Sequence, residues 1–397
     1  MPRLLTAALL GLACLGAQIV PAIAETEACR AGVWLDPASG TVRPHDAVVA
    51  AAAAQGVVLL GETHDNPEHH RWQLSTLAGL LAERPAMVIG FEAFPARVQP
   101  ALDRWVAGEL TAEAFLEEVE WRRVWGYEPE FYLPLLHFAR QHRIPVVALN
   151  VDRAFVGRVG REGWEAIPPA ERLGLGDPAA PAEAYLDRLA SSYLDHGPRR
   201  SGAAPDPGTV REDPAFRRFV DAQLTWDRAM AEALARARAR PGDPLVVGIM
   251  GSEHLRQRHG VPHQLADLGV KDAAVLLPLD RVEGCPGLAA GMADAVFVLD
   301  PPAVVQASRP RLGVMLGGEA GAVRAVEVMP GSVAEASGLL AGDTILQAAG
   351  VAIRDSADLV DLVRGLTPGT WLPLVVRRDG RTIEAVAKFP AAERTGG

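Results

Sequence analysis

Two short stretches of this chain place a glutamate and a histidine directly after an apolar run that ends in glycine. One stretch carries Glu62 and His64, and the other carries Glu253 and His254. In a parallel sheet the carboxyl ends of the strands meet at one edge, which is where α/β proteins hold their ligands. If the two strands are neighbours, His64 and His254 share one cleft.

A third carboxylate, Glu92, ends another apolar run. Imidazole and carboxylate groups bind divalent transition metals, and they also donate and accept protons near neutral pH. The pattern therefore predicts one of two sites, a metal site of Glu62, His64, Glu92, Glu253 and His254, or a catalytic site of His64, Glu92 and His254. In the alternative interpretation the acids cap nearby helices and the histidines hydrogen-bond locally.

Two further histidines follow in the first turn of a predicted helix. Adjacent helical residues point about 100° apart, so at most one of His69 and His70 can face the same cleft as His64. We expect His70 to be that residue, and a surface histidine in a first turn is the alternative.

Aromatic residues are dense between residues 121 and 132, in a chain that is only 6% aromatic. Flat apolar walls, guanidinium groups and a phenolate are the features that bound haem requires. Tyr127 or Tyr132 is the candidate iron ligand, and Arg122 and Arg123 are candidates for pairing with the propionates. The alternative is a core between a helical subdomain and a sheet. Covalent haem attachment is excluded because the chain has no Cys-x-x-Cys-His motif.

The elements that must position these residues alternate between strand and helix, which predicts an α/β fold with a mostly parallel sheet flanked by helices. Asn66 and Pro67 begin a helix that ends before Pro85. A hundred residues without a strand candidate precede residue 245, which predicts an inserted helical subdomain at about residues 95–240. Strands are expected at 87–94, 144–150, 245–254 and 273–279, within a domain over residues 25–290.

A proline-bearing linker is expected at residues 291–309, and the sequence beyond it changes to short strands with glycine turns. The run from Pro330 to Asp343, with Gly350 and Arg378-Asp379-Gly380, resembles a small β-rich PDZ domain over residues 310–390. The resemblance implies recognition of a peptide or protein C-terminus by strand addition. The implied peptide-binding residues are Leu312, Gly313, Val314 and Met315. Arg311-Leu312-Gly313-Val314 departs from the usual glycine-leucine-glycine-aromatic loop, and internal packing or binding of exposed segments is the alternative.

The first 24 residues have a basic tip, an apolar middle and a small-x-small end, which is typical of an export signal. We therefore expect a periplasmic or secreted protein. Lipid attachment at Cys14 is the less favoured alternative, because Gly11 stands where such sites want a branched apolar residue. Cys29 and Cys285 then remain as an even pair, forming a disulfide or two unrelated thiols.

The formal charge of −10 has the wrong sign for a protein whose main partner is nucleic acid. We therefore expect no nucleic-acid partner.

Several motifs follow one another in order over residues 30–285. They are Gly-Glu-Thr-His-Asp-Asn at 61–66 with His70 and Gln73, Gly-Phe-Glu-Ala-Phe at 90–94, the aromatic block at 121–132, Val-Ala-Leu-Asn at 147–150, and Gly-Ser-Glu-His at 251–254 followed by Gly-Val-Pro at 260–262. This ordered set resembles the motifs of the ChaN family. This resemblance implies a haem-binding, iron-uptake-associated envelope protein, with haem held by tyrosine and a homodimer as one possible arrangement.

The same resemblance carries an alternative. ChaN is grouped with the Tiki, TraB and erythromycin esterase proteins, in which paired Gly-x-x-His elements and a strand-end glutamate are linked to metal-dependent or general-base hydrolysis. His64, Glu92 and His254 would then be catalytic, with or without a divalent metal. The resemblance leaves open whether the chain is an enzyme.

Overall fold

The computed structural model describes residues 29–196, 210–281, 285, 287–302, 310–317 and 322–391. The predicted signal segment, Cys14 and residues 303–309 of the predicted linker lie outside these ranges. None of the helices within the described ranges has the length and hydropathy of a membrane span.

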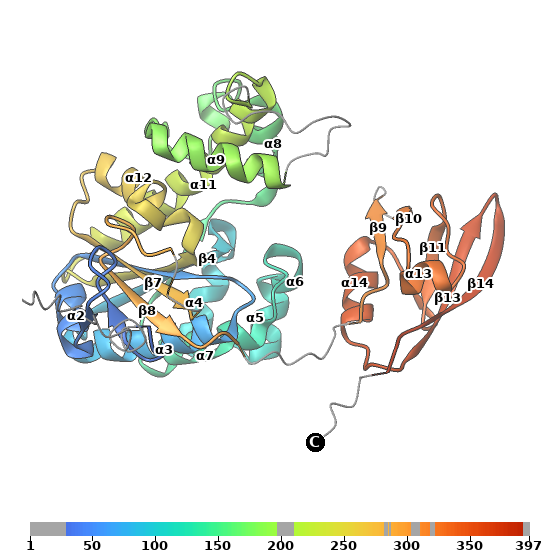
Figure 1. The fold of residues 1–397 in the computed structure, drawn as a ribbon, viewed down its shortest axis with the longest axis horizontal. Coiled ribbons are helices and arrows are strands. Elements are labelled where there is room, and N and C mark those ends of the chain that lie inside the picture. The colour runs from blue at the N-terminus through green and yellow to red at the C-terminus, as the bar shows by residue number, and fades with distance from the viewer. Residues whose placement is uncertain are drawn as a thin grey trace, which may run out of the picture.

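An eight-stranded sheet forms the centre of the larger domain (Figure 1). Its order is β2-β1-β8-β7-β3-β6-β4-β5. The six strands from β8 to β5 run parallel to one another, and β1 pairs antiparallel with β2 and β8. The predicted α/β fold with a mostly parallel sheet is confirmed. The strands are β1 (Trp34–Leu35), β2 (Val42–Arg43), β3 (Val57–Glu62), β4 (Met87–Pro95), β5 (Val146–Asn150), β6 (Leu245–Gly251), β7 (Ala273–Asp280) and β8 (Ala295–Leu299).

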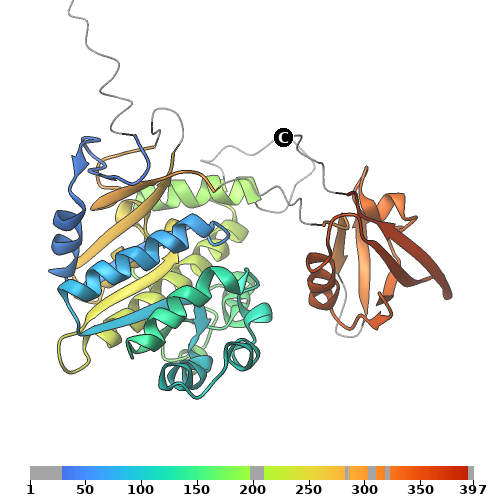
Figure 2. The same cartoon turned by 90° about the horizontal axis from the view of Figure 1, so that it is seen from below.

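Two separate apolar cores cover the two faces of this sheet. Successive strand residues point to opposite faces, so Val58 and Leu60 pack into one core while Val57 and Leu59 pack into the other. The first core includes helices α2 (His45–Ala53), α3 (Pro67–Glu83), α4 (Gln99–Ala107), α5 (Ala112–Glu118) and α7 (Pro129–Gln141), and the second includes α11 (Pro214–Arg238) and α12 (Val261–Asp267). Figure 2 shows α3 and α7 lying across the first face.

The predicted helical subdomain is smaller than residues 95–240. β5 joins the edge of the sheet, and α4, α5 and α7 cover a face of it, so the first half of that range belongs to the α/β layers. The second half contains α8 (Arg153–Glu162) and α9 (Glu183–His196), and α9 forms a small core with α11. Figure 1 shows α8 and α9 grouped next to α11 at the top of the view.

Two boundaries differ from the sequence expectation. The strand expected over residues 245–254 ends at Gly251, because the N–H of Gly251 donates to the carboxylate of Glu92 and the chain turns into a 3-10 helix, η3 (Ser252–His254). The predicted linker at 291–309 begins too early, since β8 pairs with β7 and is part of the sheet.

The C-terminal unit is an antiparallel sheet with its own core, drawn apart from the larger sheet in Figures 1 and 2. The strand order is β14-β13-β11-β10-β9, so β9 is an edge strand with one side open for pairing. The elements are β9 (Val314–Gly317), β10 (Val323–Val328), α13 (Val333–Ala336), β11 (Thr344–Ala348), β12 (Val351–Ala352), α14 (Ser356–Arg364), β13 (Trp371–Arg378) and β14 (Arg381–Lys388).

Cys29 and Cys285 form a disulfide, with Cα atoms 5.7 Å apart. Of the two interpretations that the sequence left open, the structure supports the bridge. It ties the first described residue to the segment between β7 and β8, 256 positions away.

Candidate ligand-binding site

The register of the parallel strands brings the predicted residues to one edge of the sheet. Glu62, the last residue of β3, lies beside Gly251, the last residue of β6. On the other side of β6, Phe91 of β4 pairs with Ile249, so Glu92 follows one position later. The order β3-β6-β4 thus gathers Glu62, Glu92 and the turn that carries His254.

A cavity of about 550 Å³ opens at these strand ends. His64, Glu92 and His254 line it together, so the two imidazoles face one hollow although 190 positions separate them in the chain. The remaining lining comes from other segments and comprises Ala93, Pro95, Arg97, Arg123, Val124, Trp125, Tyr127, Asn150, Val151, Asp152, Arg153, Ala154 and Trp226.

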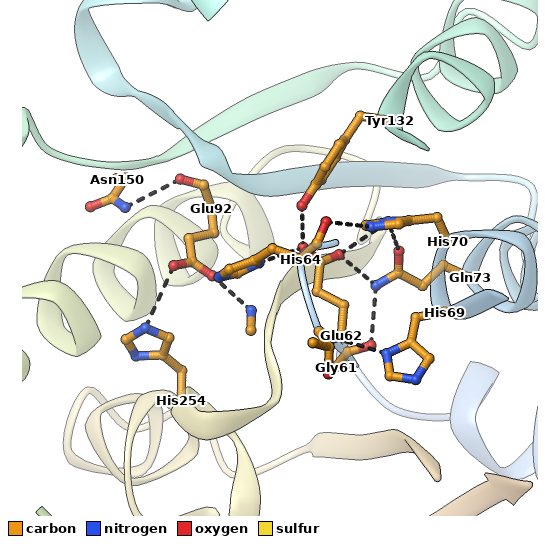
Figure 3. A network of polar contacts seen from close by, with 12 residues as sticks. Gly61, Glu62, His64, His69, His70, Gln73, Glu92, Tyr132, Asn150 and His254 are labelled. Atoms are coloured by element: carbon orange, nitrogen blue, oxygen red, sulfur yellow. Dashed lines mark hydrogen bonds and ion pairs between the residues drawn. The ribbon is translucent and has the colours of Figure 1, made fainter. Parts of the chain in front are cut away.

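The carboxylate of Glu62 is buried at the centre of a cluster behind His64. Nδ1 of His64 lies 2.8 Å from Oε1 of Glu62, and the hydroxyl of Tyr132 donates to the same oxygen at 2.5 Å. Gln73 donates to Oε2 at 2.9 Å, and Nδ1 of His70 lies 3.4 Å from that oxygen. Figure 3 shows Tyr132, His70 and Gln73 around Glu62.

A second buried carboxylate, Glu92, lies beside His254 (Figure 3). Oε1 of Glu92 is 3.5 Å from Nε2 of His254, and Oε2 accepts the N–H of Gly251 at 2.7 Å. On the other side of the ring, Nδ1 of His254 lies 2.6 Å from Oδ1 of Asp227, a fully buried residue of α11. The hydroxyl of Tyr185 donates to Oδ2 of Asp227 at 2.7 Å.

These pairings set the protonation of the site. Burial by itself lowers the pKa of His254, but the carboxylates of Glu92 and Asp227 raise it to about 10. Burial raises the pKa of Glu92, but His254 outweighs that effect and lowers it to about 2. The ring of His254 is therefore an imidazolium between two carboxylates near neutral pH.

The pKa values of His64 and Glu62 shift in the same directions as those of His254 and Glu92. Burial lowers the pKa of His64, yet the hydrogen bond to Glu62 and the charge of Glu92 raise it overall. Burial raises the pKa of Glu62, and its histidine neighbours bring it below the ordinary value. Both histidines of the cavity thus favour the charged form.

The absence of a side chain at Gly251 lets His64 sit against the end of β6. A Cβ atom built there would lie 3.0 Å from Cε1 of His64, tighter than ordinary van der Waals contact. The ring of His64 also packs at 4.6 Å, centroid to centroid, from Trp125 and at 5.0 Å from Tyr127. Its position is fixed by Glu62 behind it and two aromatic rings beside it.

The structure separates the two candidate tyrosines. Tyr127 lines the cavity, whereas Tyr132 is 1% exposed, is not part of the lining and donates its hydroxyl to Glu62. The two candidate arginines also differ. Arg123 lines the cavity, but Arg122 points elsewhere and pairs with Asp361 at 3.2 Å. The geometry therefore fits Tyr127 and Arg123 to the expected ligand roles and does not fit Tyr132 and Arg122.

The proposed metal set does not assemble. Among the described residues, no group of three or more His, Cys, Asp or Glu side chains is arranged to hold a metal ion. Glu253 is 73% exposed in its side chain and faces Arg188 and Arg256, away from the cavity. The oxygens of Glu62 are already engaged by Tyr132, Gln73 and the histidines.

His69 and His70 point in different directions, as their adjacency on a helix requires. Nε2 of His70 lies 3.1 Å from the carbonyl of His64, so His70 belongs to the cluster around Glu62. His69 accepts the N–H of Thr63 and lies 3.0 Å from Asp280. His70 supports His64 from behind and does not line the cavity.

Sequence reasoning missed several residues of the site. Asp227 was one acid within a long amphipathic helix, and Tyr185 was an isolated tyrosine, so no local pattern marked either of them. Trp226 precedes Asp227. An aromatic residue next to an acid is the one local sequence feature that could have marked these two positions as part of a site. Arg97 and Arg153 reach the cavity from segments after β4 and β5.

Replacing Asp227 by Asn tests the charge state of His254. The variant removes one carboxylate from a buried pair, so we expect the free energy of unfolding to fall by about 3–5 kcal/mol. Because the folded pKa of His254 is raised to about 10 from an ordinary 6.5, the stabilisation is fully present below pH 6.5 and is lost as the pH rises through 10. The difference between wild type and variant should therefore shrink between pH 6.5 and 10 in urea unfolding experiments.

The matched control is Asp280→Asn, which removes the carboxylate beside His69 instead. Histidine NMR spectra should show the His254 signal titrating at lower pH in Asp227→Asn and unchanged in the control. Equal titration of His254 in all three proteins would contradict the assignment.

Comparison with known proteins places this geometry in context. A family model described as "Haem-binding uptake, Tiki superfamily, ChaN" matches residues 48–265, and a PDZ domain model matches residues 310–388. No curated protein matches the chain.

Several solved structures are similar to parts of this chain. A structure described as "Cofacial heme binding to ChaN of Campylobacter jejuni" is 19% identical, covers 66% of this chain and 95% of its own, and has a TM-score of 0.51, a likeness of fold. A serine endoprotease from Yersinia pestis (24% identity) and the HtrA-type protease AlgW with decapeptide (25%) each cover 21% of this chain and 30% of their own, with TM-scores of 0.20. The family match spans more than half of the sequence, so the chain belongs to the ChaN family of haem-binding uptake proteins and carries a C-terminal PDZ domain.

Proposed function

We propose that the cavity at the strand ends binds haem, with Tyr127 as the iron ligand. The observation that carries the proposal is the position of Tyr127, the one tyrosine of the predicted pair that lines a cavity of about 550 Å³ in a chain of the ChaN family. Tyrosine is an established axial ligand of haem iron. The volume lies within the ordinary range for cofactor pockets.

The cavity lining suits a flat ligand with acceptor groups. Trp125 and Trp226 provide broad apolar surfaces. Nε1 of Trp226 is buried and has no hydrogen-bond partner within the described ranges, so an acceptor on a ligand would satisfy it.

Three arginines of the lining supply positive charge for propionates. Arg97 is already paired with Glu120 and Asp152, and Arg123 is paired with Glu120. Arg153 makes no ion pair in the described part of the chain, so its guanidinium is the cation most available to a ligand carboxylate. We assign the propionate role to Arg153 and Arg123.

The surroundings of Tyr127 control the proton on its hydroxyl and the position of its neighbour His64. Burial and the charge of Asp65 raise the pKa of Tyr127, so its phenol keeps its proton until a cation competes for the oxygen. Bound haem would supply that cation as its iron. His64 is fixed by Glu62, and its ring stands beside the phenol ring of Tyr127.

Replacing Tyr127 by Phe removes the phenolate and leaves the ring. We expect haem affinity to fall about tenfold or more, equivalent to about 1.4 kcal/mol or more, and the absorption spectrum to lose its tyrosinate character. The measurement is a haem titration followed at the Soret band.

Tyr132→Phe is the control, since it deletes a hydroxyl that serves Glu62. It should lower stability and leave the haem spectrum as in wild type. Wild-type spectrum and affinity in Tyr127→Phe would refute the ligand assignment.

The hydrolase alternative has less support from the cavity. The described residues that line it include no Ser, Thr or Cys that could act as a nucleophile. The pKa of His254 is raised to about 10 and that of Glu92 is lowered to about 2, so neither group has the near-neutral pKa that suits a general base. We therefore do not assign a hydrolytic reaction. A haem-linked homodimer stays a prediction from the family resemblance.

The PDZ domain supplies a second proposed binding activity, recognition of a peptide C-terminus. A groove of about 430 Å³ runs between β9 and α14, with Leu312, Val314 and Leu316 on one wall and Val360 and Val363 on the other. β9 is an open edge to which a peptide strand can add. Met315 points away from the groove, 48% exposed, so only its backbone can contribute.

Gly313 shapes the loop that would face the carboxylate. Its φ is +77°, and a Cβ built there would lie 2.3 Å from Cβ of Ser332. Peptides with a free C-terminus should bind the full chain about tenfold or more tightly than their amidated forms, because a charge-assisted contact is lost on amidation. Fluorescence anisotropy measures the affinities of the free and the amidated peptides.

Gly313→Ala should abolish that preference, whereas Gly338→Ala should keep it. Gly338 has a similar φ of +79° but no atom within 4 Å of its Cβ position, which makes it a matched control for backbone strain alone. Equal affinity for free and amidated peptides would contradict C-terminal recognition.

We further propose that the protein works in the cell envelope, exported by its N-terminal segment. The Cys29–Cys285 disulfide supports an oxidising compartment. Protein isolated from the periplasm should begin near Glu25 and gain two alkylated cysteines only after reduction, as measured by mass spectrometry. Reduction should lower the free energy of unfolding by about 2–4 kcal/mol.

Cys29→Ser is the control, because reductant should have no further effect on its stability. An intact residue 1 together with three freely reacting thiols, Cys14 included, would contradict export.

A further inference from the structure

A second cavity, of about 390 Å³, lies far along the strands from the first one. It opens beside Ala273 at the start of β7, whose register partner is Val57 at the start of β3. The proposed haem cavity lies past Glu62, at the opposite end of β3. The two cavities share no lining residue.

Small side chains create this second hollow. Ala51 and Ala52 of α2 face Ala274 of β7 and Ala295 of β8 across it. Larger residues at these positions would fill the space between helix and sheet, as side chains do in most cores. The packing thus leaves room for a small ligand at the edge of the domain.

Three cations converge on the same cavity from separate parts of the chain: Arg43 from β2, Arg258 from the 3-10 helix η4 (Arg256–Arg258) and Lys271 from the loop before β7. Among the described residues of the lining, Asp294 is the single acid. In a chain with a formal charge of −10, this local excess of positive charge runs against the overall balance.

The single acid does not neutralise the cluster. Oδ2 of Asp294 accepts a hydrogen bond from Nη1 of Arg258 at 2.7 Å and another from the N–H of Val275 at 2.6 Å. Arg43 donates to the backbone carbonyl of Asp294 at 3.0 Å and makes no direct ion pair with a carboxylate among the described residues. Lys271 is exposed and makes no ion pair within those ranges. Two positive charges are therefore left for a ligand.

We infer that this cavity binds a phosphate group, carried either by a small soluble phosphate compound or by a lipid headgroup. A guanidinium with free donors and a flexible ammonium form the pair of groups that proteins use to hold phosphate oxygens. The cavity is near the lower end of the size range for ligand pockets, which suits a ligand little larger than the phosphate itself.

The test uses the full chain and pyrophosphate in isothermal titration calorimetry. Wild type should show saturable binding that weakens with salt. Lys271→Glu should weaken binding about tenfold or more, because it reverses one of the two unpaired charges. Ala51→Trp should weaken it similarly without a charge change, by filling the cavity mouth from an exposed position.

Lys388→Glu is the matched control, since it makes the same change in net charge on the PDZ domain, where Lys388 lies over the ring of Trp371. It should bind pyrophosphate as wild type does. Urea unfolding of Lys271→Glu should give the wild-type midpoint, because this side chain has no partner to lose.

A parallel arm measures cosedimentation with phosphatidylcholine vesicles that contain phosphatidic acid. Sensitivity to Lys271→Glu in the calorimetry supports a soluble phosphate ligand, and sensitivity in the vesicle arm alone supports a lipid headgroup. The inference is overturned if wild type binds neither probe, or if Lys271→Glu and Ala51→Trp bind both probes as wild type does.

Discussion

Two buried carboxylates at one edge of the sheet are the constraint on which the site depends. Burying Glu62 and Glu92 as anions is costly unless each is fully paired. Glu62 is held by Tyr132, Gln73 and His64, and Glu92 by His254 and the N–H of Gly251. Because Tyr132 and Gln73 reach Glu62 from α7 and α3, and Gly251 and His254 reach Glu92 from the end of β6, the pairing requirement joins β3, β4, β6, α3 and α7 at one place.

This arrangement fixes the two histidines and leaves the cavity in front of them open. His254 is clamped between Glu92 and Asp227, and Asp227 is in turn held by Tyr185 from the helical subdomain. The subdomain thus helps to set the protonation of the α/β site as well as to cover it. Tyr127 and the arginines at the cavity are free of that inner network, which is why a ligand can engage them without breaking it.

Much of the fold could be predicted from local sequence signals. Asn66 caps α3, Pro67 begins it and Arg84 ends it, because side-chain capping and proline geometry are local effects. The paired glycine-acid-histidine stretches also predicted that His64 and His254 would face one hollow. The strand β8 was missed, because five apolar residues among prolines and glycines resemble a linker until a neighbouring strand pairs with them. The end of β6 was placed three residues too late, since a contact from Glu92, 159 positions away, decides it.

The sequence by itself determined the class of fold, the order of the elements and the types of side chain available at the strand ends, because hydrophobic periodicity and turn chemistry act over a few residues. Only the tertiary structure decided which of those side chains meet. Tyr127 and Tyr132 are five residues apart in one aromatic block, yet one faces the cavity and the other is buried on Glu62. Glu253 and His254 are adjacent, yet one is exposed and the other lies between two carboxylates. The direction of a side chain depends on backbone geometry and on partners from remote segments, and neither is encoded by neighbouring residues alone.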